Sequence, residues 1–148
     1  MIIETLLDTT ARYPDRVAAR DPFRALTYAR LTVAARVFRR IVLQQTRQQN
    51  VGIMLPSSAG GLAALLGILW AGRSAVPLNF LLQPRELAAI CGDAGLDLVI
   101  STQHFRTTLE HLRVRTLYVE ELGLRWRFVR ERLSRTPEPP KVAPNDVA

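Results

Sequence analysis

The sequence predicts an α/β fold in which a largely parallel sheet is flanked by helices on both faces. Short apolar runs of about five residues alternate with helical patterns of about ten residues or more, as in βαβ units. The short runs are apolar throughout, which is typical of strands buried on both sides of a sheet. The length of 148 residues and the hydrophobic content of 48% are those of one globular domain with its own core.

The predicted elements follow one another along the chain. Apolar residues within 31–42 recur at spacings of three and four, which predicts one face of a helix. The run 51–55 is predicted as a strand, and Ser57 or Ser58 is expected to cap a helix that ends at Trp70. The same criteria predict strands at 75–78, 96–100 and 116–119, and helical segments at 84–94, 104–112 and 120–134.

The last predicted helix, 120–134, combines an apolar stripe with many arginines. The stripe consists of Leu122, Trp126, Val129 and Leu133, and arginine occupies positions 125, 127, 130, 132 and 135. We expect this stripe to dock against the sheet, as surface helices of globular proteins do. In the alternative, the chain is a naturally short, non-catalytic binding module whose helix 120–134 and Pro-rich tail meet a partner, an anionic lipid surface or a nucleic acid.

Overall charge does not by itself predict a nucleic-acid partner. Lys and Arg number 20 against 13 Asp and Glu, a net charge of +7, but outside helix 120–134 the arginines are scattered along the chain. Polyanion binding requires positive charge concentrated on one face. We therefore expect solvated basic faces and no nucleic-acid partner.

Composition changes after residue 135. Four prolines lie within residues 136–144, which predicts an extended linker or a segment that follows the protein surface. The chain is thereby divided into an α/β domain at 1–135 and a Pro-rich segment at 136–148.

No motif in the sequence indicates a self-contained active site. Neither of the phosphate-binding patterns G-x-x-x-x-G-K-[ST] and G-x-G-x-x-G occurs, which also disfavours a stand-alone nucleotide-binding domain. His104 and His111 have no second ligand three or four residues away, so we expect no metal site. No residue is assigned as catalytic, cofactor-binding or metal-binding.

Three features predict a cytoplasmic protein. The single cysteine, Cys91, lies in an apolar segment and is expected to be a buried thiol in a reducing compartment. Acidic residues stand near the N-terminus where a signal peptide needs a basic start. The most apolar window, 62–71, is half of the roughly 20 residues that a transmembrane helix needs.

Two segments resemble motifs of the adenylate-forming (AMP-binding) acyl ligases, a family that includes acyl-CoA synthetases and acyl-carrier-protein synthetases. Residues 26–31, Leu-Thr-Tyr-Ala-Arg-Leu, resemble the first core motif, and residues 69–79 resemble the second. Segments 13–18, 51–56 and 86–100 agree with the family in order and spacing. The resemblance implies the fold of the first N-terminal subdomain of acyl-CoA synthetase-like enzymes.

Within these motifs, scaffold roles are expected. Thr27 is placed to cap a helix, but Arg30 stands where family members usually carry the Glu of a capping box, which weakens the cap. Gly72 suits a left-handed helix stop. Asn79 and Arg73, both in the second motif, are the nearest candidates for lining a cleft of the parent enzyme, although a structural role is expected for both.

The resemblance also implies a parent enzyme that uses ATP and Mg²⁺. Such a ligase converts a carboxylate, here expected to be a fatty acid, to an acyl-adenylate and then to a thioester on coenzyme A or a carrier protein. The family's Ser/Thr/Gly-rich loop ending in Pro-Lys-Gly does not occur in residues 1–148. The chain is therefore expected to be an inactive N-terminal part whose partner is the remainder of the ligase. It is also expected to self-associate through exposed apolar surface.

Overall fold

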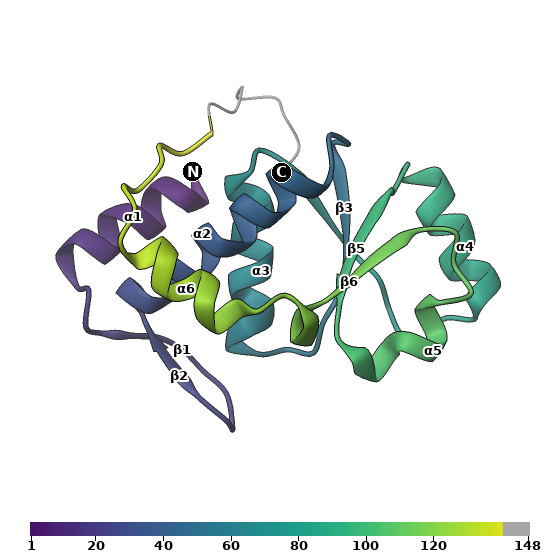
Figure 1. Ribbon diagram of the computed structural model, residues 1–148, viewed down its shortest axis with the longest axis horizontal. Helices are drawn as coiled ribbons and strands as arrows, with labels where there is room; N and C mark the ends of the chain where they lie inside the picture. Colours follow the sequence, from purple (N-terminus) through teal and green to yellow (C-terminus); the bar gives the residue numbers. More distant parts are fainter. Residues whose placement is uncertain (141–148) are drawn as a thin grey trace.

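The computed structural model describes residues 1–140 and confirms the α/β fold (Figure 1). Four parallel strands form the central sheet in the order β4–β3–β5–β6. Their bounds are Asn50–Met54 for β3, Ser74–Pro77 for β4, Leu98–Ser101 for β5 and Arg115–Tyr118 for β6. In the register, Gly52 lies opposite Val76 on one side and Val99 on the other.

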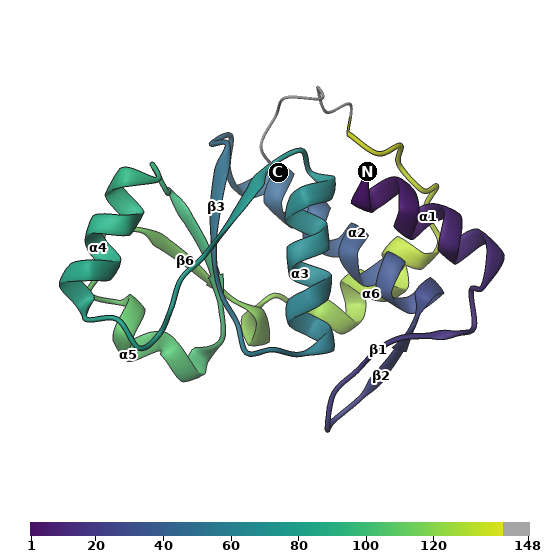
Figure 2. The same cartoon turned by 180° about the vertical axis from the view of Figure 1, so that it is seen from behind.

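Helices cover both faces of this sheet (Figures 1 and 2). On one face, α2 and α3 pack against the strands, with α1 and α6 outside them. The opposite face carries α4 and α5. The bounds are Ile2–Arg12 for α1, Tyr28–Gln45 for α2, Ala59–Trp70 for α3, Pro84–Asp93 for α4, Arg106–Leu109 for α5 and Leu124–Arg132 for α6.

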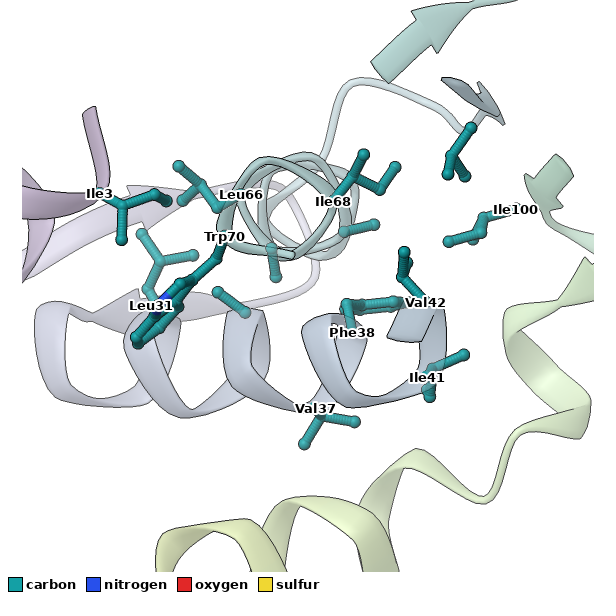
Figure 3. Close-up of a cluster of buried hydrophobic side chains, with 14 of the residues drawn as sticks. Ile3, Leu31, Val37, Phe38, Ile41, Val42, Leu66, Ile68, Trp70 and Ile100 are labelled. Carbon is teal, nitrogen blue, oxygen red and sulfur yellow. The ribbon is translucent and has the colours of Figure 1, made fainter. Parts of the chain in front are cut away.

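Each face of the sheet has its own apolar core, because alternate strand residues point to opposite sides. Figure 3 shows the larger core, where Phe38 and Val42 of α2 lie near Ile68 of α3 and Ile100 of β5. The smaller core contains Leu87 of α4 together with strand and α5 residues, namely Met54, Val99 and Leu109. Burial on both faces explains why β3 and β5 are continuous apolar runs in the sequence.

The two long helices, α2 and α3, approach each other closely at Gly67. A Cβ atom at this position would lie 2.6 Å from the carbonyl oxygen of Ala35. The glycine therefore permits the contact on which the larger core is built.

Helix ends match the expected capping residues. Thr27 Oγ1 accepts a hydrogen bond from the backbone N–H of Arg30 (3.3 Å), and Ser58 Oγ accepts one from that of Gly61 (3.0 Å). Gly72, after α3, has a φ of 72° and is the expected left-handed stop. In α4 the carboxylate of Glu86 accepts the backbone N–H of Gln83 (2.8 Å).

The sequence patterns missed the N-terminal elements of the chain. Helix α1 packs beside α2, where the Thr10 and Thr32 hydroxyls form a hydrogen bond of 2.7 Å. A short antiparallel hairpin follows, formed by β1 (Val17–Arg20) and β2 (Ala25–Thr27). Its strands are exposed or half-buried and too short to produce an apolar run.

The last helix differs from its predicted bounds. Residues Val119–Glu121 form a 3₁₀ turn (η2), and Gly123 then takes a left-handed φ of 58° before α6 begins at Leu124. The predicted segment 104–112 is likewise shorter, since the 3₁₀ turn η1 (Gln103–Phe105) leads into α5, which ends at Leu109. Both turns are local i→i+3 structures whose side-chain spacing differs little from that of an α-helix.

The expected docking of the α6 stripe on the sheet is wrong. Trp126, Val129 and Leu133 are 74%, 54% and 85% exposed. The helix packs against α2 instead, with Leu124 and Phe128 half-buried and Glu131 buried. The surface of α2 that meets α6 carries Arg36 and Arg40, which pair with Glu131, the one acid of the helix.

Residues 136–140, the described part of the Pro-rich segment, follow the surface of α2 and α3 without regular structure. Trp70 Nε1 donates a hydrogen bond to the carbonyl oxygen of Glu138 (3.2 Å), and an Arg36 Nη donates to the Thr136 hydroxyl (3.2 Å). The rest of the predicted segment 136–148 lies outside the described residues.

Candidate functional site

The strand order creates a switch point between β3 and β5. The chain leaves β3 toward α3 on one face of the sheet and leaves β5 toward α5 on the other. In open α/β sheets, ligands bind in the crevice at the carboxyl ends of two such strands. Here the flanking loops contribute Ser57 and Ser58 after β3, and Thr102 and Gln103 after β5.

On the β3 side, a carboxylate already lies at the N-terminus of α3. Asp21, from the hairpin, accepts the backbone N–H of Ala59 at 3.0 Å through one oxygen. Its other oxygen accepts the N–H groups of Phe23 (2.8 Å) and Arg24 (2.9 Å). The hydrogen bonds from these donors hold the pKa of Asp21 below its ordinary value, and the bond from Ala59 has the largest effect. Because the helix terminus is thus supplied with a negative charge, it is not arranged to receive a phosphate.

On the β5 side, the two loops after β5 and β6 are tied together. The backbone N–H of Gln103 is shared by both carboxylate oxygens of Glu120, at 3.1 and 3.2 Å. Arg106 pairs with Glu121 and lies over the Tyr118 ring, 4.2 Å from its centre. The Thr102 hydroxyl oxygen is buried and has no hydrogen-bond partner among residues 1–140. Contacts between the two loops therefore hold this edge of the sheet together.

The two candidate cleft residues lie at opposite ends of β4. Asn79 follows the strand and is exposed, and its Oδ1 accepts the backbone N–H of Leu81 at 3.0 Å, which stabilises a turn. Arg73 precedes the strand and is half-buried. Since the whole strand separates them, the two residues do not line one cleft.

The remaining reactive side chains are not assembled into a site. His104 is exposed and packs edge-on against Phe105, 5.0 Å between ring centres, and His111 is exposed. Within residues 1–140, no three His, Cys, Asp or Glu side chains come together in a way that could hold a metal. Cys91 is buried in α4, and desolvation raises the pKa of its thiol, which makes it a poor nucleophile.

Helix α6 is held on α2 by a cluster of charges. Glu131 contacts Arg36 Nε (3.3 Å) through one oxygen and Arg40 Nε (2.9 Å) through the other. Arg36 also donates to the carbonyl oxygen of Ser134 at 2.8 Å, so it fastens the residues after the helix as well. Burial, with Arg40 and Arg36 nearby, lowers the pKa of Arg39, and Glu131 opposes that effect.

An open groove of about 520 Å³ runs beside α6. It is lined by Gln44 from the end of α2 and by residues of the η2–α6 segment: Glu121, Leu122, Gly123, Trp126, Arg127 and Arg130. Arg127 is half-buried, and its Nε donates to the Leu122 carbonyl at 2.8 Å, which fixes one wall. The groove thus combines an acidic side chain, Glu121, with the aromatic Trp126 and the basic Arg127 and Arg130.

Family membership follows from a match to the whole described domain. A family model described as "AMP-binding enzyme" matches residues 6–148. The chain belongs to the AMP-binding enzyme family. The motif resemblance at 26–31 and 69–79 is thereby confirmed.

Curated relatives within the AMP-binding family are much longer than this chain. A linear gramicidin synthase from Brevibacillus parabrevis is 31% identical over 121 residues, which cover 80% of this chain and 2% of that protein. A long-chain-fatty-acid–CoA ligase from Haemophilus influenzae is 32% identical over 114 residues, covering 72% of this chain and 20% of the ligase. The chain thus spans a fifth or less of the length of these relatives.

Solved structures of AMP-binding enzymes share the fold. VinN in complex with 3-methylaspartate superposes with a TM-score of 0.83 at 24% identity, covering 99% of this chain and 42% of VinN. O-succinylbenzoate coenzyme A synthetase (MenE) from Bacillus subtilis, in complex with ATP and magnesium, gives 0.68 at 25% identity, covering 79% of this chain and 33% of MenE.

Asp21 and Glu131 belong to no motif of the sequence, although the structure places both at contacts between elements. Asp21 begins the stretch Asp-Pro-Phe-Arg, a composition typical of a turn, and that signal could have placed its side chain near backbone N–H groups. Glu131 stands among arginines in α6, and nothing in the local pattern shows that it is buried.

Proposed function

We propose that residues 1–148 are the N-terminal part of an AMP-forming acid–thiol ligase. The observation that carries the proposal is the family match over residues 6–148, which takes in nearly all of the α/β domain described in residues 1–140. The proposal is further supported by the length of the relatives, of which this chain spans a fifth or less.

The proposed reaction has two steps. In the first, a carboxylate oxygen attacks the α-phosphorus of ATP, and the bond to the β-phosphate oxygen breaks, giving an acyl-adenylate and pyrophosphate. In the second, the thiol sulfur of coenzyme A or of a carrier protein attacks the acyl carbon, which releases AMP. ATP and Mg²⁺ are proposed as the cofactors of the complete enzyme, in keeping with the ATP and magnesium bound to MenE.

The acyl substrate is proposed to be a fatty acid. Support comes from segment 77–82, which resembles the fatty-acyl branch, and from relatives that include a long-chain-fatty-acid–CoA ligase. Because a gramicidin synthase is also similar to this chain, we propose that the acyl acceptor is either coenzyme A or a carrier protein.

The cytoplasm is the proposed compartment, because the single cysteine is a buried free thiol. Across residues 1–140, no helix is both long and apolar enough to cross a bilayer.

The described domain contributes scaffold to this chemistry. Adenylation depends on charges positioned around the triphosphate. Residues 73 and 79, the nearest candidates, lie at opposite ends of a strand and do not provide such an arrangement. We therefore propose that residues 1–148 alone are inactive and that their partner is the remainder of the ligase.

ATP–pyrophosphate exchange tests the proposal directly. Residues 1–148 and the product of the source reading frame extended beyond Ala148 are assayed side by side with fatty acids of several lengths and with amino acids. We expect exchange above a no-acid blank only for the extended protein, with fatty acids as the preferred group. Exchange by residues 1–148 alone contradicts the inactivity, and no exchange by the extended protein with any acid contradicts the ligase assignment.

A further inference from the structure

We propose that the outer face of α6 binds the surface of anionic lipid bilayers. By outer face we mean the exposed apolar residues Trp126, Val129 and Leu133 together with Arg125, Arg130 and Arg132 beside them. The apolar side chains enter the boundary between headgroups and acyl chains, and the guanidinium groups contact lipid phosphates. This inference does not depend on the proposed ligase function.

The apolar part forms one continuous stripe. Val129 and Leu133 follow Trp126 by three and seven residues, so all three side chains project from the same side of the helix. They point away from α2, because the opposite side of α6 holds the buried Glu131 and the half-buried Leu124 and Phe128. Three large apolar side chains that are each more than half exposed on one helix face are unusual unless that surface has a partner.

The charges flanking the stripe are all of one sign. At about 100° of rotation per residue, Arg125 and Arg132 lie along one edge of the stripe and Arg130 along the other. The one acid of the helix, Glu131, faces α2 and is paired there with Arg36 and Arg40. The exposed surface of α6 is thus apolar in the middle and basic at both edges, a combination of side chains that suits the interface of an anionic membrane.

The nearest acids in the sequence are already engaged. Glu120 accepts the backbone N–H of Gln103, and Glu121 pairs with Arg106 on the side of the sheet edge. Glu120 therefore does not neutralise the arginines of α6, and Glu121, which lines the same groove as Arg130, shares its charge with Arg106. Anionic headgroups complement this surface, whereas neutral ones do not.

The helix is held in place before it meets a membrane. Arg36 binds both Glu131 and the Ser134 carbonyl, so the C-terminal end of α6 cannot rotate the stripe toward α2 without weakening the contacts of a buried guanidinium. Since the outer face is preorganised, binding does not require the ordering that a disordered basic segment undergoes.

A second copy of the chain fits this surface poorly. In a two-fold contact through the stripe, each copy presents the same face, so Arg130 and Arg132 of one protomer approach the same arginines of the other. A nucleic-acid backbone would use the arginines but leave the apolar stripe unused. Of these three partners, a second copy, a nucleic acid and a lipid interface, the lipid interface accommodates both features.

Vesicle flotation with the 148-residue chain is the test. Vesicles of phosphatidylcholine with about one-third phosphatidylglycerol are compared with vesicles of phosphatidylcholine alone. We expect co-flotation with the anionic vesicles only, weakened as salt is raised. Tryptophan fluorescence gives a second readout: Trp126 is exposed and should shift to shorter wavelength on binding, while Trp70, 1% exposed, already has an apolar environment.

Matched variants localise the effect. Arg130→Gln and Arg132→Gln should each weaken binding about fivefold, the value for one basic residue near an anionic surface. Arg85→Gln removes an exposed arginine from α4, on the opposite face of the sheet, and should leave binding unchanged. Leu133→Ser and Trp126→Phe alter exposed positions and should preserve the circular dichroism spectrum, with the fluorescence shift absent in Trp126→Phe.

Several results would overturn the proposal. These are no flotation with anionic vesicles, equal flotation with neutral vesicles, or flotation that the α6 variants leave unchanged. Salt-sensitive binding to a single-stranded RNA without binding to anionic vesicles would assign the surface to nucleic acid. Sedimentation that shows a dimer abolished by Leu133→Ser, with no vesicle binding by the wild type, would assign it to a second copy.

Discussion

Arg36 of α2 and Glu131 of α6 form an ion contact of 3.3 Å in which each side chain is only 5% exposed. Buried ion pairs are not strongly stabilising in themselves, but loss of one partner leaves the other charge buried and unpaired. Because Arg36 also donates to the chain after α6, this contact fixes both the orientation of the helix and the path of the segment beyond it.

Replacement of Glu131 by Gln is expected to lower the free energy of unfolding by about 3 kcal/mol, because it removes the charge that compensates Arg36 and Arg40. Urea denaturation followed by circular dichroism measures the change. Glu110→Gln, at an exposed position, is the control and should stay within about 0.5 kcal/mol of the wild type. Equal effects of the two substitutions would contradict the role assigned to Glu131.

Asp21→Ala is expected to destabilise the protein in a pH-dependent manner, because the folded state holds the pKa of Asp21 below its ordinary value of 3.8. Its contribution is present in full above that ordinary pKa and disappears as the pH falls through the folded value. The stability difference between wild type and variant should therefore be larger at neutral pH than under acid conditions. Thermal melts across that range measure it, and a difference that grows toward low pH would be inconsistent with the hydrogen bonds to Ala59, Phe23 and Arg24.

Gly67→Ala should be destabilising by about 1–3 kcal/mol, because the added Cβ would meet the Ala35 carbonyl oxygen at 2.6 Å. The matched control is Gly92→Ala in α4, where a Cβ has no neighbour within 4 Å. There the substitution should stabilise by about 0.5–1 kcal/mol, since alanine has the higher helix propensity. Urea unfolding of both variants measures the two changes in the free energy of unfolding. Changes of the same sign would show that the close helix contact at Gly67 does not limit stability.

Arg30→Glu should stabilise the chain by about 0.5–1 kcal/mol, because it completes a capping box with Thr27 and places a negative charge at the N-terminus of α2. Arg113→Glu makes the same charge change in an exposed position outside the helices and strands, and serves as the control. A gain from Arg113→Glu as large as that from Arg30→Glu would point to net charge, not capping, as the cause.

Self-association is expected at the carboxyl end of β4, where Phe80 and Leu81 are exposed and Phe80 stacks on Phe105 at 5.1 Å between ring centres. Sedimentation velocity at increasing concentration should show oligomers. Phe80→Ser with Leu81→Ser should reduce them, because less apolar surface is exposed. A strictly monomeric profile of the wild type at high concentration would rule this expectation out.

Local sequence signals predicted the central sheet and its helices correctly, apart from their exact ends. Most residues of β3 and β5 are buried, on one face of the sheet or the other, so the runs are largely apolar and the signal is strong. Thr27, Ser58 and Glu86 act on backbone groups within three residues, so their roles are visible in the sequence. The β1–β2 hairpin gave no such signal, because its strands are short and partly exposed.

The sequence by itself determined the βαβ order, the caps of α2, α3 and α4 and the family to which the chain belongs, because all of these depend on residues near one another in the chain. Only the tertiary structure decided which face of α6 is buried, because Glu131 finds its partners Arg36 and Arg40 roughly 90 residues away. It also brought Asp21 to Ala59, 38 residues away in the chain. Sequence periodicity identifies the residues that share one face of a helix. In α6, the face that turns toward α2 is the one whose Glu131 pairs with Arg36 and Arg40.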